Sequence, residues 1–150
     1  MKETTLCYIE NSGRYLMMLR NKKENDPNSG KWIGVGGKIN PGEKPADCAL
    51  REIFEETGLC VQNLKYTGKV YFLSDKWDDE LMHLFVAVSE SDRVCSCDEG
   101  TLRWIKKEDI LSLNLWEGDR VFLKRLLEGE QSFFNITLEY SGDSLVSVKE

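Results

Sequence analysis

Short runs in which hydrophobic and polar residues alternate predict several β-strands along the chain. Residues 4–9 and 14–20 are the first two runs, and the four residues Glu-Asn-Ser-Gly between them are typical of a hairpin turn. Five more runs predict strands at residues 65–73, 81–88, 101–105, 132–140 and 144–148. The last two runs predict a hairpin that closes the chain.

Hydrophobic residues spaced with a helical period predict a helix at residues 45–57. Pro45 suits the first helical position because its missing N–H costs nothing there, and Gly58 suits the position just past the end. The helix turns about 100° per residue, so we expect four of its apolar side chains to form one stripe against a core: Ala46, Ala49, Leu50 and Ile53.

The remaining segments predict one further helix and a loop rich in polar residues. The helix is expected at residues 118–127, where Gly129 provides a stop, and residues 107–111 predict a helical turn. Residues 22–30 form a polar loop, and the glycines that follow within residues 32–37 permit a close approach of the backbone to a ligand. This loop is therefore expected to flank a site.

Three carboxylates, those of Glu52, Glu55 and Glu56, lie near the C-terminal end of the first predicted helix. At about 100° per residue they share one face, beside the apolar stripe rather than opposite it. The only basic residue in the last two turns is Arg51, which can reach Glu55, so the other two acids are expected to have no partner in the helix. Acids at this end oppose the helix dipole. A solvated acidic face is the ordinary interpretation, but a bound cation explains the pattern better.

Several oxygen ligands without a nearby His or Cys suit Mg²⁺ or Mn²⁺ and disfavour zinc. The same segment resembles the Nudix box, GX5EX7REUXEEXGU, in which U is an aliphatic residue. Every fixed position of the box is matched in this sequence: Gly37, Glu43, Arg51, Glu52, Ile53, Glu55, Glu56, Gly58 and Leu59.

The resemblance to the Nudix family implies an α+β fold, an α/β/α sandwich in which a mixed sheet lies between helices. The box would form a loop, a helix and a loop, and residues 1–150 would form a single Nudix domain. The implied activity is hydrolysis of a nucleoside diphosphate that is linked to another group. Because water is a poor nucleophile and the phosphoanhydride repels anions, such a site must activate water and neutralise charge.

The resemblance also implies roles for the residues of the box. Arg51 would orient the glutamates, Glu43 would support the loop and helix, and the general base would be Glu52 or Glu56. The implied metal ligands are carboxylates joined by one backbone carbonyl: Glu52, Glu55, Glu56 and Gly36.

Outside the box, the chain is similar to MutT-type 8-oxo-dGTP diphosphatases over nearly its whole length. The similarity rests on four segments: Gly30-Lys31-Trp32, residues 34–38, Asp98-Glu99, and Trp116-Glu117-Gly118-Asp119. It implies that Glu99 is a further metal-associated glutamate. The implied substrate-binding residues, with Lys23 on the phosphate side and Trp116 with Asp119 at the base, are Lys23, Trp32, Ile33, Val35, Gly37, Lys38, Trp116 and Asp119.

Two residues depart from the pattern of the human-type enzymes. Ile33 stands where that pattern has a base-reading asparagine, and Gly118 replaces the first of two paired aspartates. An apolar side chain cannot form bidentate hydrogen bonds to a purine edge. The aromatic ring of Trp116 and the carboxylate of Asp119 still suit a purine, but the sequence leaves open whether oxidised guanine is distinguished from normal guanine.

Composition bounds the possible partners of the chain. The 150 residues are 41% hydrophobic, and the formal net charge of −6 with a pI near 5.0 excludes a broad basic surface. We therefore expect a small-molecule nucleotide and no nucleic-acid polymer. The sequence leaves open whether the protein is a monomer or a homodimer.

Five cysteines at irregular spacing, without a CxxC pair, predict reduced thiols. The first residues are polar and acidic, and no apolar run reaches the length of a membrane span. We therefore expect a cytoplasmic protein without a membrane partner. The one histidine, His83, lies in a predicted strand, and no role is assigned to it.

The leading hypothesis from the resemblance is metal-dependent hydrolysis of an oxidised purine nucleoside triphosphate to the monophosphate and pyrophosphate, which would cleanse the nucleotide pool. A second hypothesis is a Nudix pyrophosphatase for ADP-ribose, a dinucleoside polyphosphate or a nucleotide sugar. A third, of another class, is a Nudix module that senses nucleotides without hydrolysing them. Such modules usually lose glutamates of the box, whereas this chain keeps all of them.

Overall fold

Nine strands form one mixed sheet in the computed structural model, which describes residues 1–150. The strands are β1 (Lys2–Asn11), β2 (Arg14–Leu19), β3 (Trp32–Ile33), β4 (Val35–Lys38), β5 (Gln62–Ser74), β6 (Glu80–Val88), β7 (Thr101–Lys106), β8 (Phe134–Ser141) and β9 (Ser144–Lys149). Their order is β3-β2-β1-β6-β5-β8-β9, while β4 pairs with β1 and β7 pairs with β2. The pairs β1–β6 and β5–β8 are parallel and the others are antiparallel.

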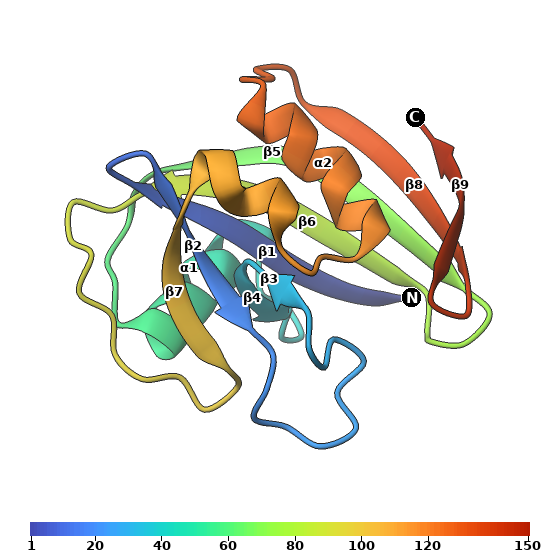
Figure 1. Cartoon of the computed structure of the whole chain (residues 1–150), viewed down its shortest axis with the longest axis horizontal. Helices are drawn as coiled ribbons and strands as arrows, with labels where there is room; N and C mark the ends of the chain where they lie inside the picture. Colours follow the sequence, from blue (N-terminus) through green and yellow to red (C-terminus); the bar gives the residue numbers. More distant parts are fainter.

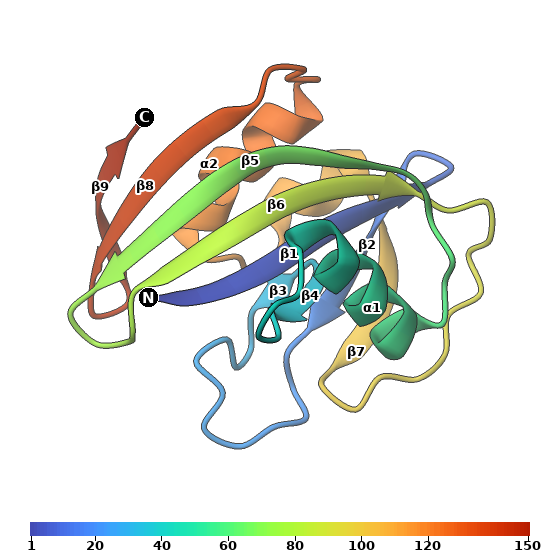
Figure 2. The same ribbon diagram turned by 180° about the vertical axis from the view of Figure 1, so that it is seen from behind.

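Helices cover both faces of this sheet. The helix α2 (Glu117–Leu127) and the 3-10 helix η1 (Lys107–Ser112) lie on the face seen in Figure 1, and α1 (Pro45–Thr57) lies on the opposite face, seen in Figure 2. The predicted sandwich of a mixed sheet between helices is therefore confirmed. Neither α-helix is long and apolar enough to cross a membrane.

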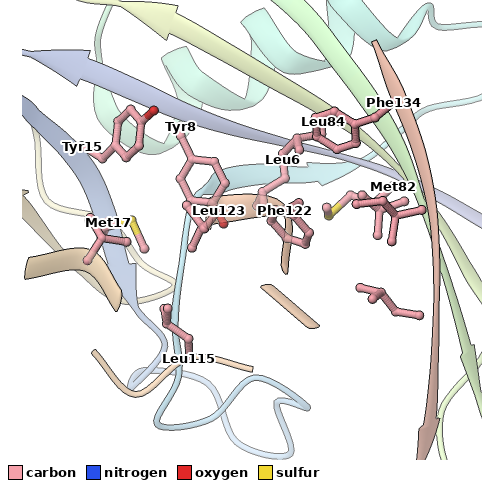
Figure 3. Close-up of a cluster of buried hydrophobic side chains, with 14 of the residues drawn as sticks. Leu6, Tyr8, Tyr15, Met17, Met82, Leu84, Leu115, Phe122, Leu123 and Phe134 are labelled. Atoms are coloured by element: carbon pink, nitrogen blue, oxygen red, sulfur yellow. The ribbon is translucent and has the colours of Figure 1, made fainter. Parts of the chain in front are cut away.

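The strand β1 organises the sheet because three strands pair along it. Its first half pairs with β4 and its end with β2, while its other edge pairs with β6 over nine residues. Side chains alternate between the two faces of a strand, so Leu6 and Tyr8 point into the core under α2, whereas Cys7 and Ile9 point into the core under α1. The larger core, under α2, contains Phe122 and residues of several strands (Figure 3).

The ends of α1 follow the predicted signals. Pro45 occupies the start of the helix, and Gly58 has a φ of 77° and donates its N–H to the carbonyl of Phe54 at 2.9 Å. A left-handed residue at this position favours glycine because glycine has no Cβ. The buried residues of the helix are Cys48, Ala49, Ile53, Glu56 and Thr57.

One part of the prediction for α1 was wrong. Ala46 and Leu50 are exposed, although the predicted apolar stripe included both. The arc of α1 that faces the sheet instead runs from Cys48 through Glu56 to Thr57. The helix therefore turns one of its carboxylates toward the protein interior, which matters for the site.

The other predicted elements are present with small shifts of their ends. The β1–β2 hairpin turns at residues 12–13, and the β8–β9 hairpin closes the chain. The predicted strand at residues 65–73 lengthens to β5, and Gly129, with a φ of 84°, follows the end of α2. All five cysteines are unpaired, in agreement with the predicted thiols.

Candidate active site

A cavity of about 760 Å³ runs along the sheet from the loop that precedes α1 to the tips of the β5–β6 and β8–β9 hairpins. One end is charged, with Glu52, Glu99 and Lys23 in its wall. The other end has aromatic side chains and one buried carboxylate, and its lining includes Phe72, Trp116, Asp119 and Tyr140. The two hairpin tips lie side by side (Figure 1) because Asp75 accepts hydrogen bonds from the Ser141 hydroxyl and the Gly142 N–H.

Arg51 is the centre of a hydrogen-bond network at the charged end. It donates to both carboxylate oxygens of Glu43, from Nε at 2.8 Å and from Nη2 at 2.9 Å. Its Nη1 donates to Glu52 at 2.8 Å and to Glu55 at 3.2 Å. The Arg51 guanidinium, with the backbone N–H of Asn40, holds the pKa of Glu43 at about 2.

This network corrects one expectation from the sequence. Arg51 was predicted to reach Glu55 alone, but it also holds Glu52. The planar guanidinium supplies five N–H groups in a fixed geometry, so one side chain can orient three carboxylates. The positioning role implied for Arg51 and the supporting role implied for Glu43 agree with this geometry.

Glu52 lies against the backbone of β4. A Cβ built on Gly37 would lie 2.5 Å from the carboxylate carbon of Glu52, which is closer than real Cβ contacts allow. Gly36 is equally constrained, since a Cβ there would meet the carbonyl oxygen of Thr5. The two glycines of the box segment therefore permit β4 to approach both α1 and β1 closely.

Glu56 is the most unusual residue of the site. The residue is 6% exposed, and neither carboxylate oxygen has a hydrogen-bond partner in the protein. Burial, with added repulsion from Glu99 and Glu52, raises its pKa to about 9. A buried carboxylate without a partner is costly, so this residue fits a site that a cation completes.

Glu99 reaches the same site from the loop before β7. Lys23 donates to its Oε1 at 2.8 Å, and Nη1 of Arg20 lies 3.7 Å from its Oε2. Hydrogen bonding to Glu99 raises the pKa of Lys23. The charged end of the cavity therefore combines acids that suit a cation with two basic side chains that suit phosphate.

The three box glutamates do not share one environment, although the sequence placed them on one face. Glu52 lines the cavity and Glu56 is buried behind it, whereas the Glu55 side chain is 55% exposed and contacts Arg51. No three His, Cys, Asp or Glu side chains are grouped closely enough to hold a metal ion as they stand. Gly36, Glu52 and Glu99 line the cavity, and Glu56 is buried where Glu99 and Glu52 repel it, so the oxygen atoms that a divalent ion prefers are all at this end.

At the other end of the cavity, Trp116 packs against the core and forms an edge-to-face contact with Tyr140, with ring centroids 5.6 Å apart. Asp119 is 5% exposed, and no hydrogen bond within the protein involves its carboxylate. Burial and the charge of Glu80 raise the pKa of Asp119 to about 7. Near neutral pH this group can therefore accept a hydrogen bond or, when protonated, donate one.

The structure explains why glycine occupies position 118. The N–H of Gly118 donates to the Tyr140 hydroxyl at 2.7 Å, and a Cβ at this position would lie 2.7 Å from that oxygen and from Leu138. Position 118 faces β8 and is not part of the cavity lining. A second aspartate has no room here, so the paired pattern cannot be formed by α2 in this chain.

The substrate-binding residues implied by the resemblance divide into two groups. Those in the cavity lining are Lys23, Ile33, Gly37, Lys38, Trp116 and Asp119. Val35 is fully buried in the core under α1, and Trp32 packs against the core under α2. Alternation along β4 turns Val35 away from the cavity, and Trp32 packs among the core side chains without lining the cavity, so the structure does not place either side chain in the cavity wall.

Several lining residues were not found by sequence reasoning. They lie on the α2 face of the long strands or in the loop before β3: Thr4, Arg20, Asn28, Phe72, Glu80, Met82 and Tyr140. The register pairs Lys2 with Glu80 and Thr4 with Met82 across β1 and β6. The sequence did contain a signal for the lining residues of the strands: polar residues two positions apart from core residues lie on the same face of a strand and so can line a cavity there. His83, in contrast, faces the other side, between Tyr66 and Glu3.

The comparison with protein families agrees with the fold and the site. The NUDIX domain matches residues 2–126, which covers most of the chain. This chain therefore belongs to the Nudix family, and it is a Nudix hydrolase. Members of this family generally use divalent metal ions, in agreement with the carboxylates at the charged end.

Two relatives and one solved structure are similar to this chain over most of their length. The chain is 31% identical over 129 residues to an oxidized purine nucleoside triphosphate hydrolase of Danio rerio, covering 85% of this chain and 80% of that protein. It is 29% identical over 135 residues to the Nudix hydrolase YvcI of Bacillus subtilis, covering 87% and 82%. A MutT protein of Bacillus halodurans has a similar structure, with a TM-score of 0.86, 26% identity, and coverage of 99% and 97%.

Proposed function

We propose that this protein hydrolyses an oxidised or non-standard purine nucleoside triphosphate, such as 8-oxo-dGTP, to the nucleoside monophosphate and pyrophosphate. It would act through one Nudix domain over residues 1–150 and use Mg²⁺, or Mn²⁺ in its place. The observation that carries the proposal is that one cavity joins a charged end, which suits a cation and phosphate, to an aromatic end that holds one buried carboxylate. The similarity to the Danio rerio hydrolase supports the substrate class.

The charged end would hold the triphosphate and the metal. A divalent ion bound there would neutralise phosphate charge and lower the pKa of a water molecule. Glu52 and Glu56 would ligate it with Glu99 and the carbonyl of Gly36, while Arg51 keeps Glu52 in place. The orphaned carboxylate of Glu56 supports this assignment.

The chain's own side chains would position the reacting groups. Lys23 and Lys38 line the cavity at the charged end, where either can neutralise a phosphate oxygen. Glu52 or Glu56 would take the proton of the attacking water, and water attack at the β-phosphorus follows from the resemblance to MutT-type enzymes. A positioned general base contributes about 10² to 10⁴ in rate.

The aromatic end would bind the base. The indole of Trp116 offers a stacking surface, and Asp119 offers a hydrogen-bonding group that no protein atom uses. Ile33 contributes apolar contact and cannot read a base edge. The base would therefore be recognised by groups other than the asparagine of the human-type pattern.

A panel of nucleotides in steady-state assays with Mg²⁺ tests the proposal. The panel contains 8-oxo-dGTP, dGTP, dATP, ADP-ribose, a dinucleoside polyphosphate and a nucleotide sugar. We expect kcat/KM to be highest for a purine triphosphate, with pyrophosphate as the released product. Preferred turnover of ADP-ribose, or release of orthophosphate from a triphosphate, would contradict it, and no turnover at all would favour a sensor module.

A further inference from the structure

One polar residue at the aromatic end of the cavity, where the base would bind, has no assigned role. Asn28 lies in the loop between β2 and β3, and it lines the cavity together with Ile33, Trp116 and Asp119. It is partly exposed, and it belongs to the polar loop at residues 22–30 that precedes the box. Its hydrogen bonds determine which of its amide atoms face a ligand.

The side-chain amide of Asn28 is oriented by Trp116. The indole Nε1–H of Trp116 donates to Oδ1 of Asn28 at 2.9 Å. Because an indole N–H can only donate, the amide atom that faces it must be the oxygen. The Nδ2 group has no hydrogen bond with any protein atom, so two N–H donors of Asn28 are available to a ligand.

The backbone of Asn28 is held on both sides. Its N–H donates to Oδ1 of Asp26 at 3.0 Å, and its carbonyl accepts the N–H of Lys31 at 2.8 Å. Asp26 is itself fixed by Nε of Arg20 at 2.7 Å, and its side chain is only 3% exposed. The amide is therefore positioned before a ligand binds, which reduces the entropy cost of a hydrogen bond to it.

We propose that Asn28 is the base-reading residue of this enzyme and that its Nδ2 donates a hydrogen bond to the 6-oxo group of a purine. The inference rests on the proposed function and names the class of base at the same site. Because Trp116 holds the amide oxygen, the amide presents its Nδ2 donors to a ligand. It matches O6 of guanine, hypoxanthine or 8-oxoguanine, and it meets the donating 6-amino group of adenine unfavourably.

This assignment accounts for the departure at position 33. Ile33 cannot provide an amide, and Asn28 supplies one from the preceding loop at the same end of the cavity. Asp119 is also available at this end, so a 6-oxopurine would meet donors from Asn28 and a carboxyl group from α2. A 6-aminopurine would instead place its own donating amino group opposite the donors of Asn28, which is the unfavourable arrangement.

Two substitutions of Asn28 test the proposal through the ratio of kcat/KM for 6-oxopurine triphosphates (dGTP, dITP and 8-oxo-dGTP) over dATP. Asn28→Leu removes the donors, and we expect the ratio to fall by roughly 10- to 100-fold. Asn28→Asp keeps an acceptor for Trp116 and presents a second acceptor to the base. We expect this variant to shift preference toward dATP.

Asn114→Asp is the matched control. Asn114 also holds this loop, because its Nδ2 donates to the Gly30 carbonyl at 2.8 Å, but it does not line the cavity. We expect it to change KM for all purines alike and to leave the ratio unchanged. Wild-type ratios in both Asn28 variants would overturn the inference while the proposed function stood.

Measurements of nucleotide binding distinguish a failure of the proposed reaction from a failure of the role assigned to Asn28. The chain has four tryptophans, so quenching of tryptophan fluorescence can follow binding of GDP and ADP without turnover. If the wild type hydrolyses no purine triphosphate but binds GDP more tightly than ADP, and Asn28→Asp removes that preference, the proposed reaction fails and the role of Asn28 holds. Equal binding of GDP and ADP by the wild type would overturn the inference.

Discussion

The carboxylate of Glu52 rests directly on the backbone of Gly37, where a Cβ would come within 2.5 Å of its carboxylate carbon. The carboxylate of Glu52 therefore occupies the space that a side chain at position 37 would fill. Glu52 can take this position only because residue 37 is glycine. The glycine and glutamate of the Nudix box are coupled by packing as well as by chemistry.

Gly37→Ala should therefore displace Glu52 without unfolding the protein. A shift of about 1 Å in a catalytic group can cost roughly 100-fold in rate, and we expect a fall in kcat of this order with a small change in melting temperature. Gly129→Ala is the control, because Gly129 has a φ of 84° and no neighbour within 4 Å of a built Cβ. That variant should lose roughly 1 to 2 kcal/mol of stability, the cost of a Cβ in the left-handed region, and keep full turnover. Wild-type kcat in Gly37→Ala would contradict the argument.

Substitution of each box glutamate by glutamine should give unequal effects. Glu52→Gln and Glu56→Gln should lower kcat by roughly 10³-fold or more, because Glu52 lines the charged end of the cavity and the unpaired carboxylate of Glu56 is buried next to it. Glu55→Gln should cost less than roughly 10-fold, since the Glu55 side chain is 55% exposed and has one 3.2 Å contact with Arg51. In titrations with Mn²⁺, the Glu52→Gln and Glu56→Gln variants should lose more metal affinity than Glu55→Gln. Equal losses in all three variants would show that the helix end rearranges when metal binds.

Arg51→Lys should reduce activity because lysine cannot reproduce the two parallel hydrogen bonds to Glu43 or the contact with Glu52. We expect kcat to fall by roughly 10- to 100-fold, with a lower melting temperature. Arg120→Lys is the matched control. Arg120 bonds to Glu117 and to two backbone carbonyls of the segment before α2, outside the cavity. It should lose stability and keep kcat, and a similar fall in kcat would mean that the effect of Arg51 is only structural.

Asp119 should make stability depend on pH. Its pKa in the folded protein is about 7, above the ordinary 3.8, because it is buried near Glu80, and Lys31 offsets this only partly. The folded state keeps a proton that the unfolded state releases, so the free energy of unfolding should fall as pH rises from about 4 to 7 and then level off. At roughly 1.4 kcal/mol per pKa unit, the loss is at most about 4.5 kcal/mol.

Asp119→Asn should remove the contribution of Asp119 to this pH dependence, since an amide does not titrate, while the contribution of Glu56, whose pKa burial raises to about 9, is the same in both proteins. Thermal melts of both proteins between pH 4 and 8, without nucleotide, measure the difference. The variant should gain stability relative to the wild type as pH rises, and parallel curves would contradict the raised pKa. Tyr8 and Tyr140 also face Asp119, but burial raises the pKa of both well above this range.

Local signals in the sequence were sufficient for most of the elements, whereas the residues of the charged end came from the resemblance to the Nudix box. Pro45 and Gly58 fix the ends of α1 through the geometry of single residues. Their effects act within a few positions of the chain, so a pattern can record them. The hairpin between β1 and β2 follows from four residues for the same reason.

The residues at the aromatic end of the cavity could not be predicted in the same way, because they come together only in the tertiary fold. Asn28 faces the cavity because Asp26 and Trp116 hold it, and Trp116 is 88 residues away in the sequence. Val35 was expected at the substrate by resemblance, whereas the alternation along β4 buries it. The rotation of α1 that buries Glu56 depends on contacts with the sheet. Periodicity shows which residues share a face and does not show which face meets a ligand.

The cavity wall includes Lys2 at one extreme of the sequence and Gly142 at the other. During synthesis on the ribosome, the complete nucleotide site therefore cannot exist until β8 has emerged and paired with β5. A nucleotide that binds only the finished site acts on the folding equilibrium of the whole chain and stabilises it by about 2.7 kcal/mol at a hundred times its Kd. Cellular nucleotide levels would then influence how long each newly made copy resists proteolysis.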